Sequence, residues 1–272
     1  MIWIFPAERT EKMEYKNEKI LVEKPEKYVA LITLNNPPLN LVTLELSAEL
    51  RDTLFKLNKD DEVRVVVLTG SGTRAFCVGS DVKEFPKVWD DVIGKKLQKE
   101  NETFNAIEFL DKPVIAAMEG NVCGGGFEMA MACDMRIMAE NGRIAQPEIN
   151  LGVFPGSGGL FRLPKLVGAS KAMEMMYLGE FIEAEECLRL GLVNRLAPEG
   201  KAVETALTVA KAIAQKPFEA IKLIKKGVRE IGMVSSAECF YKNLDFSRSI
   251  FQTEDCAEGV DAFLNKRPPE FK

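Results

Sequence analysis

A run of three glycines directly before an apolar segment is the feature that most constrains how this chain can fold. Gly124 to Gly126 precede Phe127 to Cys133, a segment in which Glu128 is the only charged residue. If this segment is a helix, the glycines lie at its positive end, where backbone N–H groups can approach a ligand without obstruction by side chains. An unpaired carboxylate is costly to bury. We therefore predict a buried helix whose N-terminus binds a polarised oxygen and whose Glu128 has a chemical role.

Length and charge narrow the class of protein. The 272 residues suffice for one large domain, or for a domain with a smaller appendage. Every stretch long enough to span a membrane contains charges, so no transmembrane helix is expected. Residues 1–17 fit neither a secretory signal nor an acid-poor transit peptide, and we expect a loosely docked arm there. A net charge of −5 does not favour nonspecific binding of nucleic acid.

The reactive side chains limit the available chemistry. Six cysteines include no Cys-x-x-Cys pair, which favours reduced, buried thiols in a cytoplasmic protein. Histidine is absent, which excludes Ser-His and Cys-His nucleophilic mechanisms and histidine-ligated metal sites. Carboxylates are then the natural proton carriers. Glu148, which follows Gln-Pro, is a second candidate, because two carboxylates facing one water can divide the acid and base roles.

Hydrophobic periodicity predicts an α/β architecture with a mainly helical C-terminal part. The expected strands are residues 19–22, 28–34, 63–68, 113–118, 135–138 and 192–196, with residues 23–27 as a hairpin connection. The expected helices are one containing Leu46, Leu50, Leu54 and Leu57 and capped by Thr43, and then residues 91–110, 127–133, 202–215, 218–231 and 237–250. We divide the chain into an arm at 1–17, a core at 18–198 and a helical region at 199–272.

Four blocks of sequence resemble the crotonase (enoyl-CoA hydratase/isomerase) superfamily. They are Phe76 to Glu84, Pro113 to Asp134, Gln146 to Gly168 and the closing Phe-Leu-Asn-Lys-Arg, and they occur in the family's order. The resemblance runs from about Lys19 to the C-terminus. It implies a crotonase-like ββα spiral with a helical C-terminal oligomerisation region. It also implies a homotrimer, often paired into a homohexamer.

The resemblance further implies a reaction and the residues that perform it. An enoyl-CoA hydratase adds water reversibly to a trans-2-enoyl-CoA and gives a 3-hydroxyacyl-CoA, without a metal or other cofactor, since coenzyme A is part of the substrate. Backbone N–H groups of Ser80 and Gly125 would polarise the thioester carbonyl. Glu128 would activate the water, and Glu148 would protonate the α carbon. Because Ser80 would act through its backbone, we expect Ser80→Ala to have little effect.

Further positions correspond to CoA-binding segments of the family, although Val78 departs from the small residue usual there. Val78, Asp81 and Lys83 belong to a loop that runs along CoA, and Lys83 matches a lysine that reaches a phosphate. Lys266 matches a C-terminal lysine that approaches CoA, often from a neighbouring subunit, although an ordinary solvated lysine explains it equally well.

Three other functions are compatible with the sequence. An enoyl-CoA isomerase shifts a double bond and can work with one carboxylate, and a cyclic dienoyl-CoA hydratase uses the same machinery on another acyl group. A noncatalytic, RNA-binding relative is a third alternative, which the acidic net charge disfavours. The presence of both glutamates favours hydration, but the sequence does not select the acyl group.

Overall fold

The computed structural model describes residue 15, residues 17–230 and residues 235–272. Almost all of the arm expected at 1–17 therefore lies outside the described residues. Within the described ranges, no helix is both long and apolar enough to cross a membrane.

The larger of two sheets has six strands in the order β1-β2-β3-β5-β7-β10. β1 pairs antiparallel with β2, and every later pair is parallel. The strands are β1 (Ile20–Glu26), β2 (Tyr28–Leu34), β3 (Val63–Gly70), β5 (Val114–Met118), β7 (Met135–Ala139) and β10 (Arg195–Ala197). β5 is buried along its whole length, as expected for a parallel strand that is covered on both faces.

The smaller sheet has the order β4-β6-β8-β9 and contains the strands that lead into the glycine run and into Glu148. Its strands are β4 (Ala75–Cys77), β6 (Asn121–Cys123), β8 (Arg143–Ala145) and β9 (Ile182–Glu183). Three times in succession, the chain adds one strand to the larger sheet and the next strand to the smaller one. This repetition is the ββα spiral that the sequence predicted.

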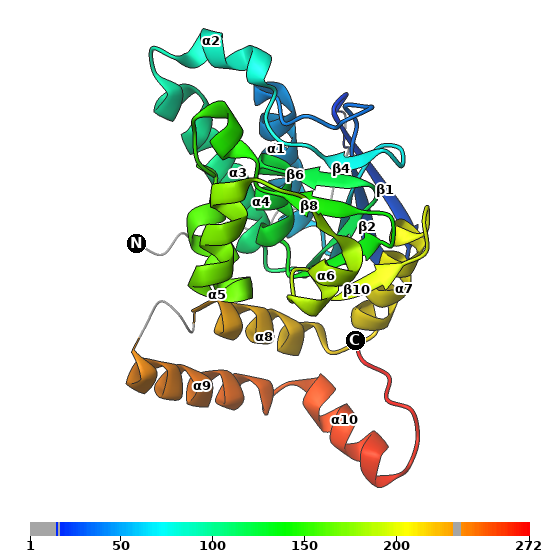
Figure 1. The fold of residues 1–272 in the computed structure, drawn as a ribbon. Coiled ribbons are helices and arrows are strands. Elements are labelled where there is room, and N and C mark those ends of the chain that lie inside the picture. Colours follow the sequence, from blue (N-terminus) through cyan, green and yellow to red (C-terminus); the bar gives the residue numbers. More distant parts are fainter. Residues whose placement is uncertain (1–14, 16, 231–234) are drawn as a thin grey trace.

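Helices cover both faces of the larger sheet (Figure 1). On one face α1, α3 and α4 enclose the main core, and on the other face α7 packs on β2, β3, β5 and β7. The α-helices are α1 (Leu44–Lys59), α2 (Phe85–Val88), α3 (Gln98–Glu108), α4 (Gly125–Ala132), α5 (Gly159–Leu178), α6 (Ala184–Arg189), α7 (Ala202–Ala214), α8 (Phe218–Glu230), α9 (Ser236–Ile250) and α10 (Glu254–Leu264). Short helices of other types are η1 (Val82–Glu84), η2 (Ile93–Leu97) and η3 (Glu148–Leu151). The side chain of Thr43 caps α1, as predicted.

Three predicted elements differ in detail. β1 continues to Glu26, so most of the hairpin connection expected at 23–27 is strand; the register shifts between Glu23 and Glu26, which accommodates Pro25. The helix expected at 91–110 includes a π-helical turn, η2, before α3. The last strand of the larger sheet is Arg195–Ala197 and not 192–196, because Leu192 and Val193 are buried in the core just before it.

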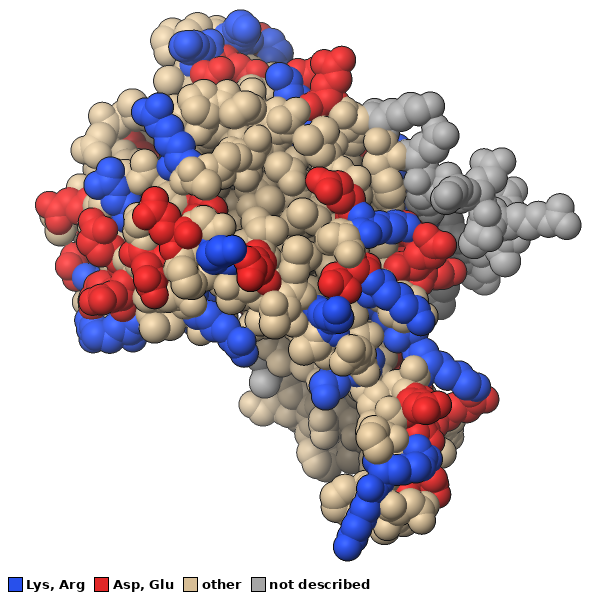
Figure 2. Space-filling view, turned by 90° about the vertical axis from the view of Figure 1, so that its right-hand side faces the viewer, with Lys and Arg blue, Asp and Glu red and all other residues tan. Residues whose placement is uncertain are grey.

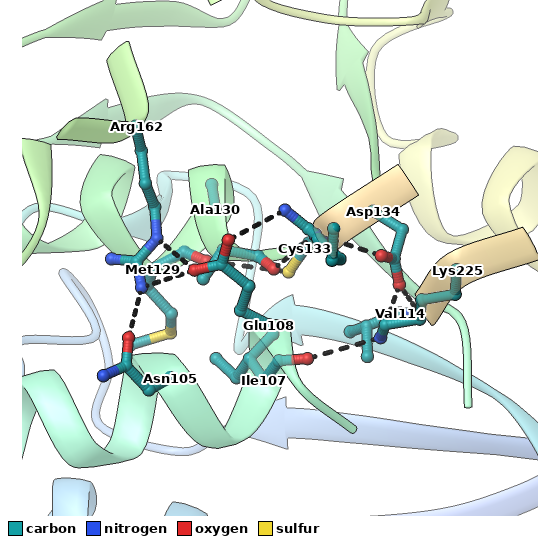
Figure 3. A network of polar contacts seen from close by, with 12 residues as sticks. Asn105, Ile107, Glu108, Val114, Met129, Ala130, Cys133, Asp134, Arg162 and Lys225 are labelled. Carbon is teal, nitrogen blue, oxygen red and sulfur yellow. Dashed lines mark hydrogen bonds and ion pairs between the residues drawn. The ribbon is translucent and has the colours of Figure 1, made fainter. Parts of the chain in front are cut away.

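A network of buried and partly buried charges attaches α8 to the body of the protein (Figure 3). Lys225 and Arg229 of α8 both pair with Asp134, which directly follows α4 and accepts a hydrogen bond from the Val114 N–H. Arg229 also pairs with Glu108 at the end of α3, and Glu108 in turn binds Arg162 of α5. The C-terminal helices α9 and α10 lie below α8 (Figure 1). The division of the chain at residue 198 remains a prediction.

Candidate active site

The candidate site is built where three parallel strands of the smaller sheet end. Ser80 follows β4, Gly124 and Gly125 follow β6, and Glu148 follows β8. Register pairs Cys77 with Val122 and Cys123 with Ala145, so the three strand ends lie side by side. Ligand sites typically occur at the carboxyl ends of parallel strands. Residues that are far apart in the sequence are thereby brought together.

Two backbone N–H groups at these ends are free to bind a ligand. Val42 forms an isolated parallel bridge with Ser80, in which it bonds to the flanking Gly79 and Asp81. This pattern leaves the Ser80 N–H on the side of the strand that faces away from Val42. Gly125 is the first residue of α4, so its N–H has no acceptor within the helix. Neither N–H is taken by an acceptor in the described part of the chain. They are a candidate pair of donors at the N-terminus of α4.

A side chain at each of the three glycine positions would have a different structural consequence. Gly124 has a φ of 50°, and a Cβ there would lie 3.1 Å from Glu148 Oε1. A Cβ at Gly126 would lie 2.2 Å from the Cys77 carbonyl oxygen, so α4 could not pack against β4. A Cβ at Gly125 would make only ordinary contacts, 3.7 Å from the Ser80 nitrogen. Gly125 therefore keeps open the space between the two free amides.

Glu128 lies in the first turn of α4 and is 3% exposed. Its Oε1 accepts hydrogen bonds from the N–H groups of Ser157, at 2.8 Å, and Gly159, at 2.7 Å. Gly159 is the first residue of α5, so a helix N-terminus also stabilises the carboxylate. No hydrogen bond from the described residues reaches Oε2, which remains able to accept a proton from water.

Glu148 lies at the start of η3 and borders the same space. Gln146 is fully buried, and with its amide nitrogen turned toward Glu148 it donates to both carboxylate oxygens, at 3.1 and 3.2 Å. A Cβ on Gly159 would lie 3.0 Å from the Gln146 amide and 3.2 Å from Glu128 Oε1. The Gln146 side chain thus lies near both carboxylates.

Burial shifts the acid–base behaviour of both glutamates. Burial, with a smaller contribution from the negative charge of Glu148, raises the pKa of Glu128 to about 8, although the two N–H donors act to lower it. Burial also raises the pKa of Glu148 to about 7. Perturbed pKa values in a site of converging polar groups are typical of catalytic acids and bases. Near neutral pH the pair holds a proton that can be moved between substrate and protein.

The raised pKa values predict a stability cost at alkaline pH. As pH rises from the ordinary glutamate value toward 8, the unfolded chain releases protons that folded Glu128 retains, so stability falls. Glu128→Gln removes this cost and can still accept both N–H bonds. We expect its stability gain over the natural chain to approach roughly 4 kcal/mol, or about 8–16 °C in Tm, at pH 8 and to shrink toward pH 5. Thermal unfolding of both proteins across this range tests it, with Glu102→Gln on the surface of α3 as a control. An equal change at both pH values would contradict it.

Of the expected CoA-binding residues, three lie close to Ser80 in the sequence and one, Lys266, lies in a distant part of the chain. Val78, Asp81 and Lys83 lie in the same loop as Ser80; Asp81 caps η1 by accepting the Lys83 N–H at 3.0 Å, and the Lys83 side chain is exposed. Lys266 follows α10, which lies below α8, far from α2 at the top of the molecule (Figure 1). Its side chain is exposed and makes no polar contact within the described residues. One chain alone does not bring Lys266 to the loop.

Sequence reasoning missed several residues around the site. Ser157 and Gly159 bind Glu128 through their backbones, and the only sequence signal was the Gly-Ser-Gly-Gly run. Glu100 of α3 is 2% exposed and accepts a hydrogen bond from the Ser80 hydroxyl at 3.0 Å. The polar sequence of α3 resembles that of a surface helix and gave no sign of this burial. The Ser80 side chain therefore makes a contact with a buried carboxylate, and Ser80→Ala is now expected to have an effect. The described residues include no cluster of three carboxylate or thiol side chains placed to hold a metal.

Comparison with known proteins agrees with the fold. The family model described as enoyl-CoA hydratase/isomerase matches residues 24–272. The chain is 37% identical over 263 residues to a short-chain-enoyl-CoA hydratase of Clostridium acetobutylicum, covering 95% of this chain and 98% of the relative. It is 35% identical over 271 residues to a crotonyl-CoA hydratase of Syntrophomonas wolfei, covering 95% of this chain and 99% of the relative.

A solved structure gives the same result. The crystal structure of an enoyl-CoA hydratase from Bacillus anthracis superposes with a TM-score of 0.89 at 34% identity, covering 93% of this chain and 99% of that one. The chain therefore belongs to the enoyl-CoA hydratase/isomerase family. The predicted crotonase-like α/β fold is confirmed.

Proposed function

We propose that this protein is an enoyl-CoA hydratase that adds water reversibly to a trans-2-enoyl-CoA. The observation that carries the proposal is one space bordered by two free backbone N–H groups and two carboxylates, buried Glu128 and half-buried Glu148. Enzymes named as short-chain-enoyl-CoA and crotonyl-CoA hydratases are similar to it over nearly their whole length. No metal or separate cofactor is part of the proposal, since coenzyme A enters with the substrate.

The reaction assigns a task to each group. The thioester oxygen accepts hydrogen bonds from the N–H groups of Ser80 and Gly125. Glu128 takes a proton from water as the water oxygen bonds to the β carbon, and the electrons of the double bond move onto the thioester oxygen. Glu148 then delivers its proton to the α carbon, and the carbonyl re-forms. Each N–H donor is worth about 2.7–4 kcal/mol where such a donor has been removed from another enzyme.

These roles require Glu128 to be ionised and Glu148 to be protonated. Burial raises the pKa of both glutamates in the free protein, so the pair retains a proton near neutral pH. A hydrogen bond from the reacting water to ionised Glu128 favours the arrangement in which that proton is on Glu148.

Isomerisation of a 3-enoyl-CoA is the second candidate. It needs the same N–H pair but only one proton-carrying carboxylate, and the presence of a second glutamate favours hydration. A panel of CoA thioesters with product identification tests the proposal and the acyl group together. It contains crotonyl, longer 2-enoyl, 3-enoyl and cyclic dienoyl compounds. Hydration of crotonyl-CoA is the expected result, whereas a shifted double bond without hydration would favour the isomerase.

We also propose a cytoplasmic enzyme that does not bind nucleic acid. Cys77, Cys123, Cys133 and Cys187 are free and buried, which suits a reducing compartment. Lys and Arg are interspersed with Asp and Glu on the face shown in Figure 2, without a continuous basic area. A salt-titrated RNA-binding assay separates this proposal from the RNA-binding alternative.

Assembly through the C-terminal helices is a further part of the proposal. α8 and α9 border a largely apolar groove of about 740 Å³. Large apolar side chains of this region are at least 60% exposed in one chain: Ile224, Val228, Phe240, Tyr241, Phe251, Phe263 and Leu264. Exposed apolar surface of this extent is typical of protein–protein interfaces. A trimer or dimer of trimers would cover it.

We expect Lys266 to bind CoA only in such an assembly. Lys266→Ala should weaken binding of CoA thioesters by about 10-fold, and binding of pantetheine thioesters that lack the nucleotide phosphates much less, because a charge-assisted hydrogen bond is lost. Calorimetry with both ligands measures this, light scattering at several concentrations gives the assembly, and Lys201→Ala is a control at an exposed lysine paired with Glu204. Equal losses for both ligands, or a fully active monomer, would contradict the proposal.

A further inference from the structure

Another carboxylate, which is buried, lies beside the site and has no task in the reaction described above. Glu100 is 2% exposed and projects from α3. Its Oε1 accepts the hydroxyl of Ser80 at 3.0 Å, and its Oε2 accepts the hydroxyl of Ser157 at 2.8 Å. Lys96, which is 1% exposed, places its Nζ 2.8 Å from Oε1. Both oxygens of Glu100 are thus occupied by protein groups.

The two serines belong to different parts of the site. The backbone N–H of Ser80 is one of the two free amides, and the backbone N–H of Ser157 donates to Glu128. Their segments are separated in the sequence by all the elements from η1 to η3. Among the described residues, Glu100 is the side chain that binds the hydroxyls of both.

We propose that Glu100 is a positioning residue, which sets the Ser80 amide at the correct distance and angle from Glu128. The inference rests on the hydratase function proposed above. The hydroxyl of each serine binds Glu100, which is fixed on helix α3. This contact also orients the backbone N–H of the same serine. An oxyanion donor and a general base must keep their relative geometry to a fraction of an ångström, and such geometry requires supporting hydrogen bonds.

Lys96 connects this cluster to the other end of the Ser80 loop. Its Nζ lies 3.6 Å from Glu84 Oε2, and Glu84 accepts the Leu44 N–H at 3.1 Å. Lys96 lies in the π-helical turn η2, a type of irregularity that is frequent at functional sites. A buried ion pair is weak evidence for stability, because desolvation offsets the attraction between the charges. The functional importance of Lys96 and Glu100 therefore lies in the segments that they position and not in the stability of their ion pair.

Glu100 does not replace Glu128 or Glu148 as a catalytic residue. Both of its oxygens accept serine hydroxyls, whereas Glu128 Oε2 receives no hydrogen bond from the described residues. A role in positioning predicts a loss in turnover with little change in substrate binding. It also predicts that the two serine hydroxyls matter only while Glu100 is present.

The test uses the double variant Lys96→Met/Glu100→Leu, which removes the carboxylate without leaving a buried unpaired charge. With crotonyl-CoA we expect kcat to fall about 10- to 100-fold while KM changes less than about threefold, as for the loss of interactions made mainly in the transition state. Glu102→Gln, an exposed carboxylate of the same helix that pairs with Arg51, is the matched control and should retain full activity. Circular dichroism and thermal unfolding establish that each variant is folded.

A second readout follows the amides directly. Bound acetoacetyl-CoA ionises to an enolate that absorbs in the near ultraviolet, and two well-placed N–H donors favour that form. We expect the double variant to bind this ligand with a smaller enolate fraction. An unchanged fraction together with full kcat would overturn the proposal.

Single hydroxyl deletions keep the test decisive if the double variant does not fold. Ser80→Ala and Ser157→Ala should each lower kcat about 3- to 10-fold. If one carboxylate couples the two serines, the double variant Ser80→Ala/Ser157→Ala, which retains Glu100, should lose little more kcat than the more impaired single variant. Fully additive losses, or no loss in either variant, would refute the coupling. Hydration of crotonyl-CoA by the natural chain is measured first, since its absence would refute the proposed function and not the role of Glu100 in particular.

Discussion

Glu128→Gln and Glu148→Gln are each expected to lower the turnover of enoyl-CoA hydration by at least about 10²-fold, with modest effects on CoA binding. Each substitution keeps the size of the side chain and removes a group that must accept or donate a proton, and a positioned acid or base contributes about 10²–10⁴-fold. For Glu128 the geometry supports an intact variant, because an amide oxygen can still accept the N–H groups of Ser157 and Gly159. Steady-state kinetics with crotonyl-CoA and calorimetric binding of a CoA thioester separate the two quantities.

The same variants distinguish hydration from isomerisation. If Glu128→Gln loses hydration but still shifts the double bond of a 3-enoyl-CoA, Glu148 is the proton carrier at the α carbon. Near-normal hydration by either variant would remove that glutamate from the mechanism. Glu102→Gln serves here too as the control for loss of a carboxylate, since Glu102 pairs with Arg51 on the surface of the protein.

Gly125→Val is expected to lower turnover by about 10²-fold or more while the protein remains folded. The first added carbon would make only ordinary contacts, 3.6 Å from Ser80 Oγ and 3.7 Å from Ser80 N, so the fold tolerates it. It would occupy the space in which the thioester oxygen must lie, and loss of one such donor costs about 10²–10³-fold. Gly125→Ala should give a smaller loss in the same direction.

Gly126→Ala provides the contrast on the neighbouring residue. Its added carbon would lie 2.2 Å from the backbone oxygen of Cys77, and we expect a lower Tm and poor folding. Thermal unfolding and turnover of the three variants together separate obstruction of the site from damage to the fold. Full activity in a folded Gly125→Val protein would mean that the thioester oxygen does not bind between Ser80 and Gly125.

The elements that sequence predicted best are those specified by local pattern. Residues 28–34 form a strand with the expected bounds, and Thr43 caps its helix because a short hydroxyl side chain at that position satisfies a free N–H. The π-helical turn η2 was not predicted, because it depends on where Lys96 is buried and not on the apolar spacing of its segment. The strand near residue 195 was misplaced for a similar reason, since burial of Leu192 and Val193 comes from tertiary packing.

The sequence by itself determined the chemical composition of the candidate site. A charged residue in an apolar helix after three glycines, a second glutamate in a turn-rich segment and the absence of histidine together indicated carboxylate chemistry beside backbone donors. Resemblance to the crotonase superfamily added the thioester and the roles of individual residues. None of these signals required knowledge of which segments meet.

Only the tertiary structure decided how the site is held together. The ends of β4, β6 and β8 meet because the spiral returns each strand to the same sheet, and α3 then passes close enough for Glu100 to bind Ser80 and Ser157. Burial, which raises the pKa of Glu128, is likewise a property of the packed core. Local pattern encodes the conformation of a segment through its own side chains, whereas hydrogen bonds and desolvation depend on neighbours that the chain supplies from distant positions.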